Sequence, residues 1–226
     1  MKKVILTLML LPALMANRVS GQDISNLIRN EVASSVAAAE VMYRDLHQNP
    51  ELSLMEFNTA AKMADALGRL GFEVTTGVGG NGVVGVLRNG KGPVIMLRAD
   101  MDALPVRETT GLPFASTITV ATPQGPETPV MHACGHDLHM TVWHGTVQTL
   151  VALKSKWKGT LVAIAQPAEE VSGGSDRMIA DGLYIRFPKP DYALCYHVSA
   201  DLPAGTVGYF PGAIFAGVNS ADLKVF

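Results

Sequence analysis

Near the start of the chain, apolar residues recur every three or four positions, which is the spacing of an amphipathic helix. The residues of this stripe are Ile24, Leu27, Ile28, Val32 and Val36. The stripe predicts a helix over residues 24–48, which the following Pro50 ends. A second stripe predicts a helix that stops at Gly71, and Ser53 and Glu56 have the spacing of a capping box at its start.

Four short apolar runs bounded by turn residues have the length and composition of β-strands. They span residues 83–87, 94–98, 161–166 and 192–196. The residues from 109 to 129 are rich in Thr, Pro and Gly, so we expect an irregular loop there. Helical spacing returns after residue 136, with Asp137 as the expected N-cap, and a short polar helix is expected over residues 175–180. This alternation predicts an α/β fold with a mostly parallel sheet covered by helices.

Composition and charge narrow the class of protein. The 226 residues are 48% hydrophobic and 17% charged, with a net charge of −2, which is typical of a globular domain. This near-neutral balance provides no basic surface for nucleic acid. The length suits one medium α/β domain or slightly more.

The first 21 residues have the pattern of a secretory signal peptide. The positive pair Lys2-Lys3 precedes an apolar run over residues 4–16 that is too short to span a bilayer comfortably. Small residues at positions 19–21 predict cleavage before Gln22, with cleavage after Ala16 as the second choice. We therefore expect a periplasmic or secreted protein with no stable membrane span after cleavage; an uncleaved anchor is the alternative.

Two cysteines in an exported protein raise the question of a disulfide. A Cys134–Cys195 bond in a binding domain without metal is one interpretation. Cys134, however, lies inside a histidine cluster, where a thiolate would be a good metal ligand. Cys195 lies in an apolar run and is expected to be a buried core residue.

Residues 131–139 contain the densest cluster of reactive side chains, with three histidines and one cysteine. Because His132, Cys134 and His136 alternate, an extended segment would place their side chains on one side. Nitrogen and sulfur donors gathered in this way favour a divalent transition metal. Each histidine taken alone could instead be a surface residue or a hydrogen-bonded core residue.

Polar side chains also follow three of the predicted strands. They are Asp100, Asp102, Glu169, Glu170 and His197. Sites in open α/β sheets lie at the carboxyl ends of strands, so we expect these residues to converge with the cysteine–histidine segment. Metal ions there would lower the pKa of bound water, and one of two adjacent glutamates could act as a general base. Amide hydrolysis is the reaction that fits this set best.

Five motifs, in order, resemble the metallo-amidohydrolases that include hippurate hydrolases, N-acyl-amino-acid aminoacylases and indole-acetyl-amino-acid hydrolases. The motifs are HQNPELS (47–53), LRADMDALP (97–105), MHACGHDLH (131–139), QPAEE (166–170) and YHV (196–198). The resemblance implies a zinc-exopeptidase-like catalytic domain that carries a smaller lid domain. It also implies two divalent ions, Zn or Mn, with Co or Ni tolerated.

The resemblance further implies roles for individual side chains. The implied metal ligands are Cys134, His136, Glu170 and His197, and the implied catalytic residues are Glu169, as general base, and Asp100, as a support behind the ligands. Arg98 departs from the pattern, because distant relatives have a ligand histidine at this position. His132 and His139 are expected to be supports.

Members of this family are considerably longer, and the resemblance places a further ligand histidine near their C-terminus. We therefore expect residues 22–212 to form an incomplete catalytic domain and residues 213–226 to be the hinge and first strand of a lid. The expected substrate is an N-acyl amino acid or small peptide, with weak or no turnover by this chain and a homodimer only where the lid is present. The alternatives are a deacetylase or dipeptidase of the same family, or a non-catalytic metal-binding or interaction fragment.

Overall fold

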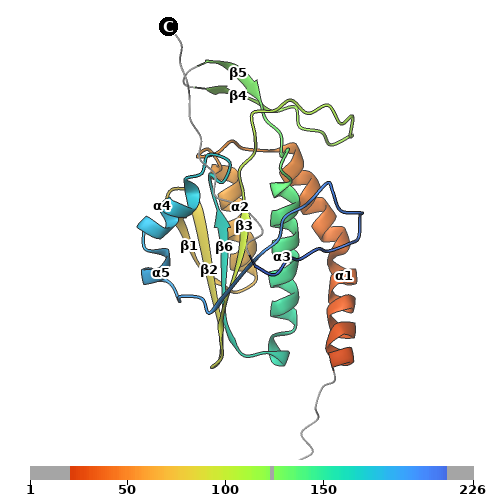
Figure 1. The fold of residues 1–226 in the computed structure, drawn as a ribbon, viewed down its shortest axis with the longest axis vertical. Helices are drawn as coiled ribbons and strands as arrows, with labels where there is room; N and C mark the ends of the chain where they lie inside the picture. Colours follow the sequence, from red (N-terminus) through yellow and green to blue (C-terminus); the bar gives the residue numbers. More distant parts are fainter. Residues whose placement is uncertain (1–20, 123–124, 213–226) are drawn as a thin grey trace, which may run out of the picture.

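The computed structural model describes residues 21–122 and 125–212. A five-stranded sheet lies at its centre, in the strand order β1-β2-β6-β3-β7 (Figure 1). The strands are β1 (Glu73–Val78), β2 (Gly82–Asn89), β3 (Val94–Asp100), β6 (Gly159–Gln166) and β7 (Tyr192–Cys195). The predicted signal peptide, apart from Gly21, and the predicted lid segment over residues 213–226 lie outside the described residues.

The strands that lead to the candidate site are parallel. β3 lies between β6 and β7 and pairs with both in parallel, whereas β2 pairs antiparallel with β6 and with β1. The predicted α/β class is confirmed, and its parallel part holds the three strands whose carboxyl ends were expected to converge. The sequence pattern does not predict β1, because its largely polar residues form no apolar run.

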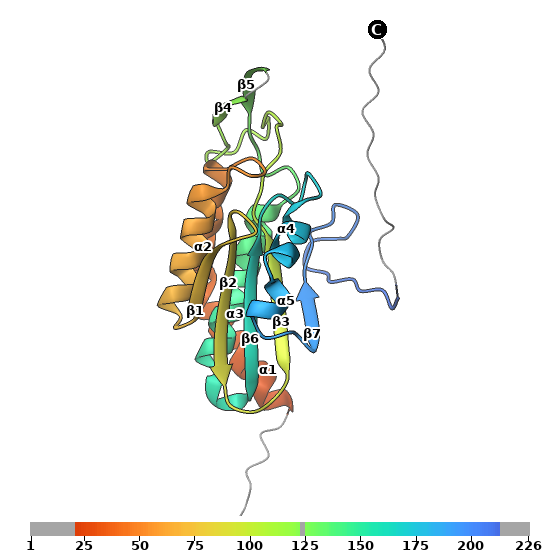
Figure 2. The ribbon, with the colours of Figure 1, turned by 90° about the vertical axis from the view of Figure 1, so that its left-hand side faces the viewer.

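Helices cover both faces of the sheet (Figure 2). α2 (Phe57–Arg69) and α3 (His136–Ala152) pack on one face, and α1 (Gly21–Gln48) packs against α3 on the same side. The short helices α4 (Gly174–Ala180) and α5 (Leu183–Arg186) pack on the other. Within the part of the chain that the structure describes, no helix is both long and apolar enough to cross a membrane.

Side chains of β6 alternate between two apolar cores, as the two-residue period of a strand requires. Ala163 faces the core beneath α2 and α3, whereas Val162 and Ile164 face the core beneath α4 and α5. Trp143 of α3 donates a hydrogen bond from Nε1 to the carbonyl oxygen of Leu97 at 3.1 Å. This bond fixes α3 against β3 and therefore fixes the first turn of α3 beside the ends of the parallel strands.

Ser53 and Glu56 do not form the predicted capping box. The first free N–H groups of α2 are bound by Glu51 instead, whose carboxylate accepts from Asn58 N at 3.1 Å and from Thr59 N at 2.7 Å. Ser53 and Glu56 are hydrogen-bonded to loops of the candidate site, because buried partners far along the chain compete successfully for them. That part of the sequence prediction is wrong.

Asp137 is likewise not the N-cap of α3. The helix begins one residue earlier, after Gly135, whose backbone is left-handed with φ 77°. Asp137 lies in the first turn, where its Oδ2 accepts a hydrogen bond from His47 Nδ1 at 2.6 Å.

Two further predictions need correction. The loop expected over residues 109–129 contains a hairpin of β4 (Thr119–Thr122) and β5 (Gly125–Pro129), whose polar strands have no apolar alternation to mark them.

Cys195 is exposed, because β7 pairs only with β3 among the described residues and no described element covers its side chains. Both cysteines are free, so the structure lacks the alternative disulfide. A 3₁₀ turn, Lys154–Lys156, connects α3 to β6.

Candidate metal centre

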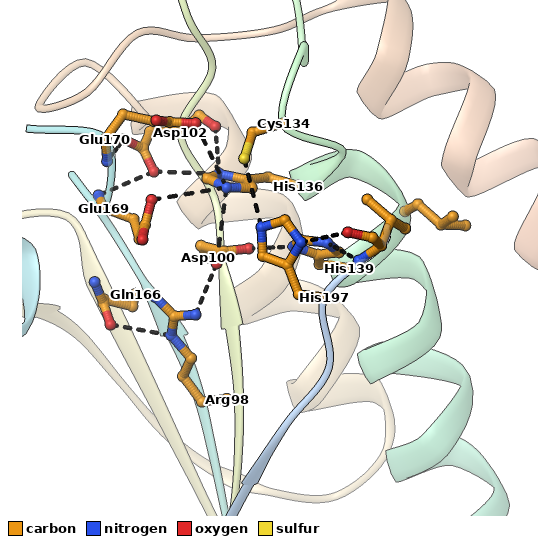
Figure 3. Close-up of polar contacts among 12 residues, drawn as sticks. Arg98, Asp100, Asp102, Cys134, His136, His139, Gln166, Glu169, Glu170 and His197 are labelled. Atoms are coloured by element: carbon orange, nitrogen blue, oxygen red, sulfur yellow. Dashed lines mark hydrogen bonds and ion pairs between the residues drawn. The ribbon is translucent and has the colours of Figure 1, made fainter. Parts of the chain in front are cut away.

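The candidate site lies where the carboxyl ends of β3, β6 and β7 meet the first turn of α3 (Figure 3). Asp100 is the last residue of β3, Glu169 and Glu170 follow β6, and His197 follows β7. Cys134 precedes α3, and His136 is its first residue. The structure thus brings to one place the six side chains that were predicted to form the site.

Among the described residues, side-chain atoms that could bind a metal form three overlapping groups, and the atoms of each group lie within 4.8 Å of one another. The groups are Cys134, His136 and His197; Asp100, His136 and His139; and His136, Glu169 and Glu170. His136 belongs to all three. Its imidazole is therefore the centre of the cluster.

The ring of His136 is fully buried and is oriented by the backbone just after β3. Its Nδ1 donates a hydrogen bond to the carbonyl oxygen of Asp102 at 2.7 Å. That bond turns Nε2 toward the acidic side chains, 3.7 Å from Glu170 Oε1 and 3.9 Å from Glu169 Oε2. Burial opposes protonation, but Asp102 and Asp100 outweigh it and raise the pKa of His136. A proton and a metal ion would compete for the same nitrogen.

Two buried atoms at the centre of the site have no hydrogen-bond partner among the described residues. They are Nε2 of His136 and Oε1 of Glu170. Unpaired buried polar atoms are rare in folded proteins, and a bound water or ion can satisfy them. Burial and the neighbouring negative charges of Glu169 and Asp102 raise the pKa of Glu170. A bound cation would stabilise the ionised form of this carboxylate. The residues present therefore fit a divalent metal.

Cys134 lies beside His197. Its Sγ is 3.4 Å from Nε2 of His197, whose Nδ1 donates to the Val198 carbonyl at 2.6 Å. Burial, together with the charges of Glu170 and its neighbours, raises the pKa of the Cys134 thiol to about 12. Positive charge reverses this effect, because thiolates form next to bound cations.

Asp100 is buried and contacts both His139 of α3 and Arg98 of β3. Its Oδ1 accepts a hydrogen bond from His139 Nδ1 at 2.7 Å, and its Oδ2 forms an ion pair with Arg98 Nη1 at 2.7 Å. Burial alone would raise its pKa, but the hydrogen bond from His139 and the charge of Arg98 lower it to about 2. Arg98 also donates to Gln166 Oε1 at 3.0 Å, and a guanidinium has no lone pair for a metal.

His139 links Asp100 to the strand end that holds His197. With Nδ1 donating to Asp100, its Nε2 accepts a hydrogen bond from the backbone N–H of Val198 at 3.0 Å. This chain of bonds orders the residue that follows His197. The arrangement is what the expected supporting role of His139 requires.

His132 does not share a side with Cys134 and His136, so the predicted extended arrangement is wrong. The segment turns at Gly135, where the N–H bonds back to the His132 carbonyl at 3.2 Å, and α3 begins directly afterwards. His132 is buried, lies outside the three donor groups, and burial lowers its pKa to about 4. Its ring nitrogens have no hydrogen-bond partner among the described residues.

Several residues that hold the site have no individual role assigned to them from the sequence. His47 is buried between Asp137 and Glu108, at 2.6 Å and 3.0 Å, and ties the end of α1 to the first turn of α3. Asp102 accepts hydrogen bonds from Ser53 and from two loop N–H groups. Their positions in the first two motifs, HQNPELS and LRADMDALP, were the signal that could have identified them.

A profile of peptidase family M20/M25/M40 matches residues 96–224, more than half of the chain. The chain belongs to this peptidase family. The match covers four of the five motifs and every side chain assigned to the site. The predicted resemblance is thereby confirmed at the level of the family.

Named relatives of this M20 chain include hydrolases of several kinds. Thermostable carboxypeptidase 2 of Saccharolobus solfataricus is 38% identical over 207 residues, which are 90% of this chain and 50% of the relative. Hippurate hydrolase of Campylobacter jejuni is 39% identical over 194 residues, which are 82% of this chain and 46% of the relative. The chain therefore spans about half the length of the curated relatives that it matches.

A solved structure supports the same placement. The crystal structure of a Bacillus subtilis protein, named a dinuclear metal binding peptidase from the M20 family, matches with a TM-score of 0.62 and 33% identity. The match covers 79% of this chain and 45% of that protein. The M20 fold of this chain is thus supported by both sequence and structure.

Proposed function

We propose that this site hydrolyses an amide bond in N-acyl amino acids or small peptides with the help of divalent metal. The observation that carries the proposal is the buried pair of unpartnered atoms, His136 Nε2 and Glu170 Oε1, which face each other at 3.7 Å. Named relatives that include a carboxypeptidase, a hippurate hydrolase and an N-acetylcysteine deacetylase support the reaction class. The alternative within the family, a deacetylase or dipeptidase, would hydrolyse an amide bond in a different substrate by the same chemistry.

The proposed ligands are the thiolate, imidazole and carboxylate donors of the cluster. They are Cys134, His136, Glu170 and His197. Mixed sulfur, nitrogen and oxygen donors suit Zn or Mn, and Co or Ni would be accepted by the same set. Bound ions, two in a complete site, would polarise the substrate carbonyl and make a water molecule more acidic.

The two adjacent glutamates divide the work in the proposed reaction. The side chain of Glu170 is 18% exposed and faces the buried ring of His136, whereas that of Glu169 is 39% exposed. Glu169 can therefore reach a solvent-derived water, take its proton as general base and deliver that proton to the leaving amine. Asp100 holds His139, and through it the His197 strand end, in place.

The test separates metal binding from hydrolysis. Metal content would be measured on the purified chain, and hydrolysis on N-benzoyl and N-acetyl amino acids and on dipeptides. Glu169→Gln should keep the metal and lower the rate by about 100-fold or more, whereas Glu73→Gln, an exposed change on β1, should alter neither. Wild-type turnover in Glu169→Gln would refute the assignment of the base, and a chain without bound metal would refute the site.

Because the chain spans about half the length of its relatives, metal binding tests the site even where turnover is weak. Residues 22–212 are proposed as catalytic-domain sequence and residues 213–226 as the start of a lid, so this chain should bind metal with weak or no turnover. Bound metal without turnover would support either a catalytic site in an incomplete domain or a non-catalytic metal-binding fragment. Measuring the same variants in a version extended with the part of a relative that this chain does not span would distinguish an incomplete catalytic domain from a metal-binding fragment.

We also propose export, because the first 21 residues have a signal-peptide pattern. Cell fractionation and N-terminal sequencing of the exported protein would test this. A mature N-terminus at Gln22 is expected, and an intact Met1 in the cytoplasm would contradict it.

A further inference from the structure

Three successive backbone N–H groups in the site loop are each bound by a buried carboxylate. Ala168 N donates to Glu56 Oε1 at 2.8 Å. Glu169 N donates to Asp102 Oδ1 at 3.1 Å, and Glu170 N donates to Asp102 Oδ2 at 3.0 Å. Glu56 is 0% exposed and Asp102 is 1% exposed. The backbone that carries the two functional glutamates is therefore held by side chains from two other parts of the chain.

Ala168 has a backbone conformation that it would not adopt without such support. Its φ is 50°, in the left-handed region that a non-glycine residue occupies only at an energetic cost. Leu54 is also left-handed, with φ 68°, and its N–H donates to the same Glu56 Oε1 at 2.9 Å. One carboxylate oxygen thus holds two strained turns that are far apart in the sequence.

The second oxygen of Glu56 binds a third loop. Asn81, in the turn between β1 and β2, donates from Nδ2 to Glu56 Oε2 at 2.9 Å. A fully buried carboxylate is unfavourable unless its oxygens are hydrogen-bonded, and here three donors meet that need. Glu56 lies outside the candidate metal-donor groups, and its hydrogen bond to the site loop is made with the backbone N–H of Ala168.

We propose that Glu56 is a positioning residue for the Glu169–Glu170 pair. By fixing Ala168 in the left-handed conformation, it sets the direction in which the loop leaves β6 and hence where the two carboxylates point. The inference rests on the proposed roles of Glu169 and Glu170. It adds to them a residue that touches neither the substrate nor the metal.

The chemistry of the contacts defines an informative pair of variants. Glu56→Ala removes the acceptor and leaves the N–H groups of Ala168 and Leu54 unpaired. Glu56→Gln keeps one oxygen for both N–H groups, and the side-chain amide of Asn81 can turn to present its oxygen to the new NH₂ group. A role in positioning therefore predicts loss in Glu56→Ala and rescue in Glu56→Gln.

Glu51 supplies a matched control. Its carboxylate also accepts hydrogen bonds from two backbone N–H groups, those of Asn58 and Thr59, but these belong to the start of α2. Glu51→Ala should destabilise the fold through α2 without releasing the loop at Ala168. General destabilisation and loss of positioning are thereby distinguished.

The first measurement is hydrogen–deuterium exchange of the Ala168 amide in the full chain without metal. The wild type should show strong protection, Glu56→Ala should exchange about tenfold faster or more, and Glu56→Gln and Glu51→Ala should stay within about threefold. The second is zinc affinity by chelator competition, which should fall about tenfold or more in Glu56→Ala alone.

Each outcome decides the proposal. An unprotected Ala168 amide in the wild type would overturn it, and this measurement needs no variant to fold. Equal losses of affinity in Glu56→Ala and Glu51→Ala would also overturn it, since they would show only general destabilisation. A wild-type chain that binds no zinc would refute the proposed function, whereas the exchange experiment would still show whether Glu56 fixes the loop.

Discussion

Nε2 of His136 lies 3.7 Å from Oε1 of Glu170, and neither atom has a hydrogen-bond partner among the described residues. The distance is too long for a hydrogen bond but suits two donor atoms that share one cation. This pair connects the first residue of α3 to the loop after β6, so metal bound between them would join two parts of the fold. Metal binding should therefore stabilise the folded chain.

Zinc should raise the thermal unfolding temperature of the chain, because the fold brings the donors of the proposed site together. At 100 times the dissociation constant, binding would add about 2.7 kcal/mol to the free energy of unfolding. Glu170→Ala should lose most of this shift, whereas Glu73→Ala on the exposed side of β1 should keep it. Calorimetry with and without a chelator measures the effect, and equal shifts in both variants would contradict the assignment of Glu170.

Cys134→Ser should remove the thiolate contribution to the metal spectrum. The Cys134 sulfur lies 3.4 Å from His197 Nε2, in a donor group with His136, whereas Cys195 lies on β7 outside the donor groups. Cobalt-loaded protein should show a thiolate-to-metal charge-transfer band that disappears in Cys134→Ser and persists in Cys195→Ser. Affinity should fall by about tenfold or more in the first variant only. A band that survives in Cys134→Ser would show that another residue supplies the ligand.

His47→Gln should destabilise the fold more at low pH than at high pH. Burial lowers the pKa of His47, but hydrogen bonds to Glu108 and Asp137 outweigh it and raise the pKa above its ordinary value of 6.5. A raised histidine pKa stabilises the folded state fully below the unfolded pKa, and this contribution disappears as the pH rises through the folded pKa. The loss in the free energy of unfolding should be about 1.5–3 kcal/mol near pH 6 and smaller near pH 9.

His144 provides the control for this pH dependence. Burial without a charged partner lowers its pKa, so the unfolded chain binds the proton more tightly. His144→Gln should therefore relieve destabilisation in acid, which is the opposite trend. Denaturant unfolding across this pH range measures both variants, and parallel pH profiles for wild type and His47→Gln would contradict the ion-pair interpretation.

The part of the site at the strand ends could be predicted from the sequence, for a physical reason. A parallel strand of an α/β sheet is typically an apolar run in the sequence, so the first polar residues after it mark the point where the strand ends. Asp100, Glu169 and His197 all follow such runs, and the structure gathers them at one edge. Their grouping therefore follows from local pattern and the geometry of a parallel sheet.

The contacts that hold the site could not be predicted in the same way, because they join distant residues. Ser53 and Glu56 have the local spacing of a capping box, but Ser53 bonds to Asp102, 49 residues away, and Glu56 bonds to Ala168, 112 residues away. Burial decides this competition, since an unpaired buried group costs more than a helix cap gains. The exposure of Cys195 has a related cause, because an apolar run does not reveal what covers it.

Gly135→Ala should test whether the turn before α3 can accommodate a side chain. Gly135 has φ 77°, and a Cβ there would lie 2.5 Å from Cγ2 of Val198, the residue after His197. Both the backbone conformation and the contact disfavour alanine, so we expect a loss of about 1–3 kcal/mol in the free energy of unfolding together with weaker metal binding. Gly145→Ala, inside α3 where the new Cβ would have no atom within 4 Å beyond the adjoining helix backbone, should instead be neutral or stabilise the chain by up to about 1 kcal/mol. Denaturant unfolding of the two variants side by side would decide the point, and equal stability would show that Val198 and the turn can move apart without affecting the site.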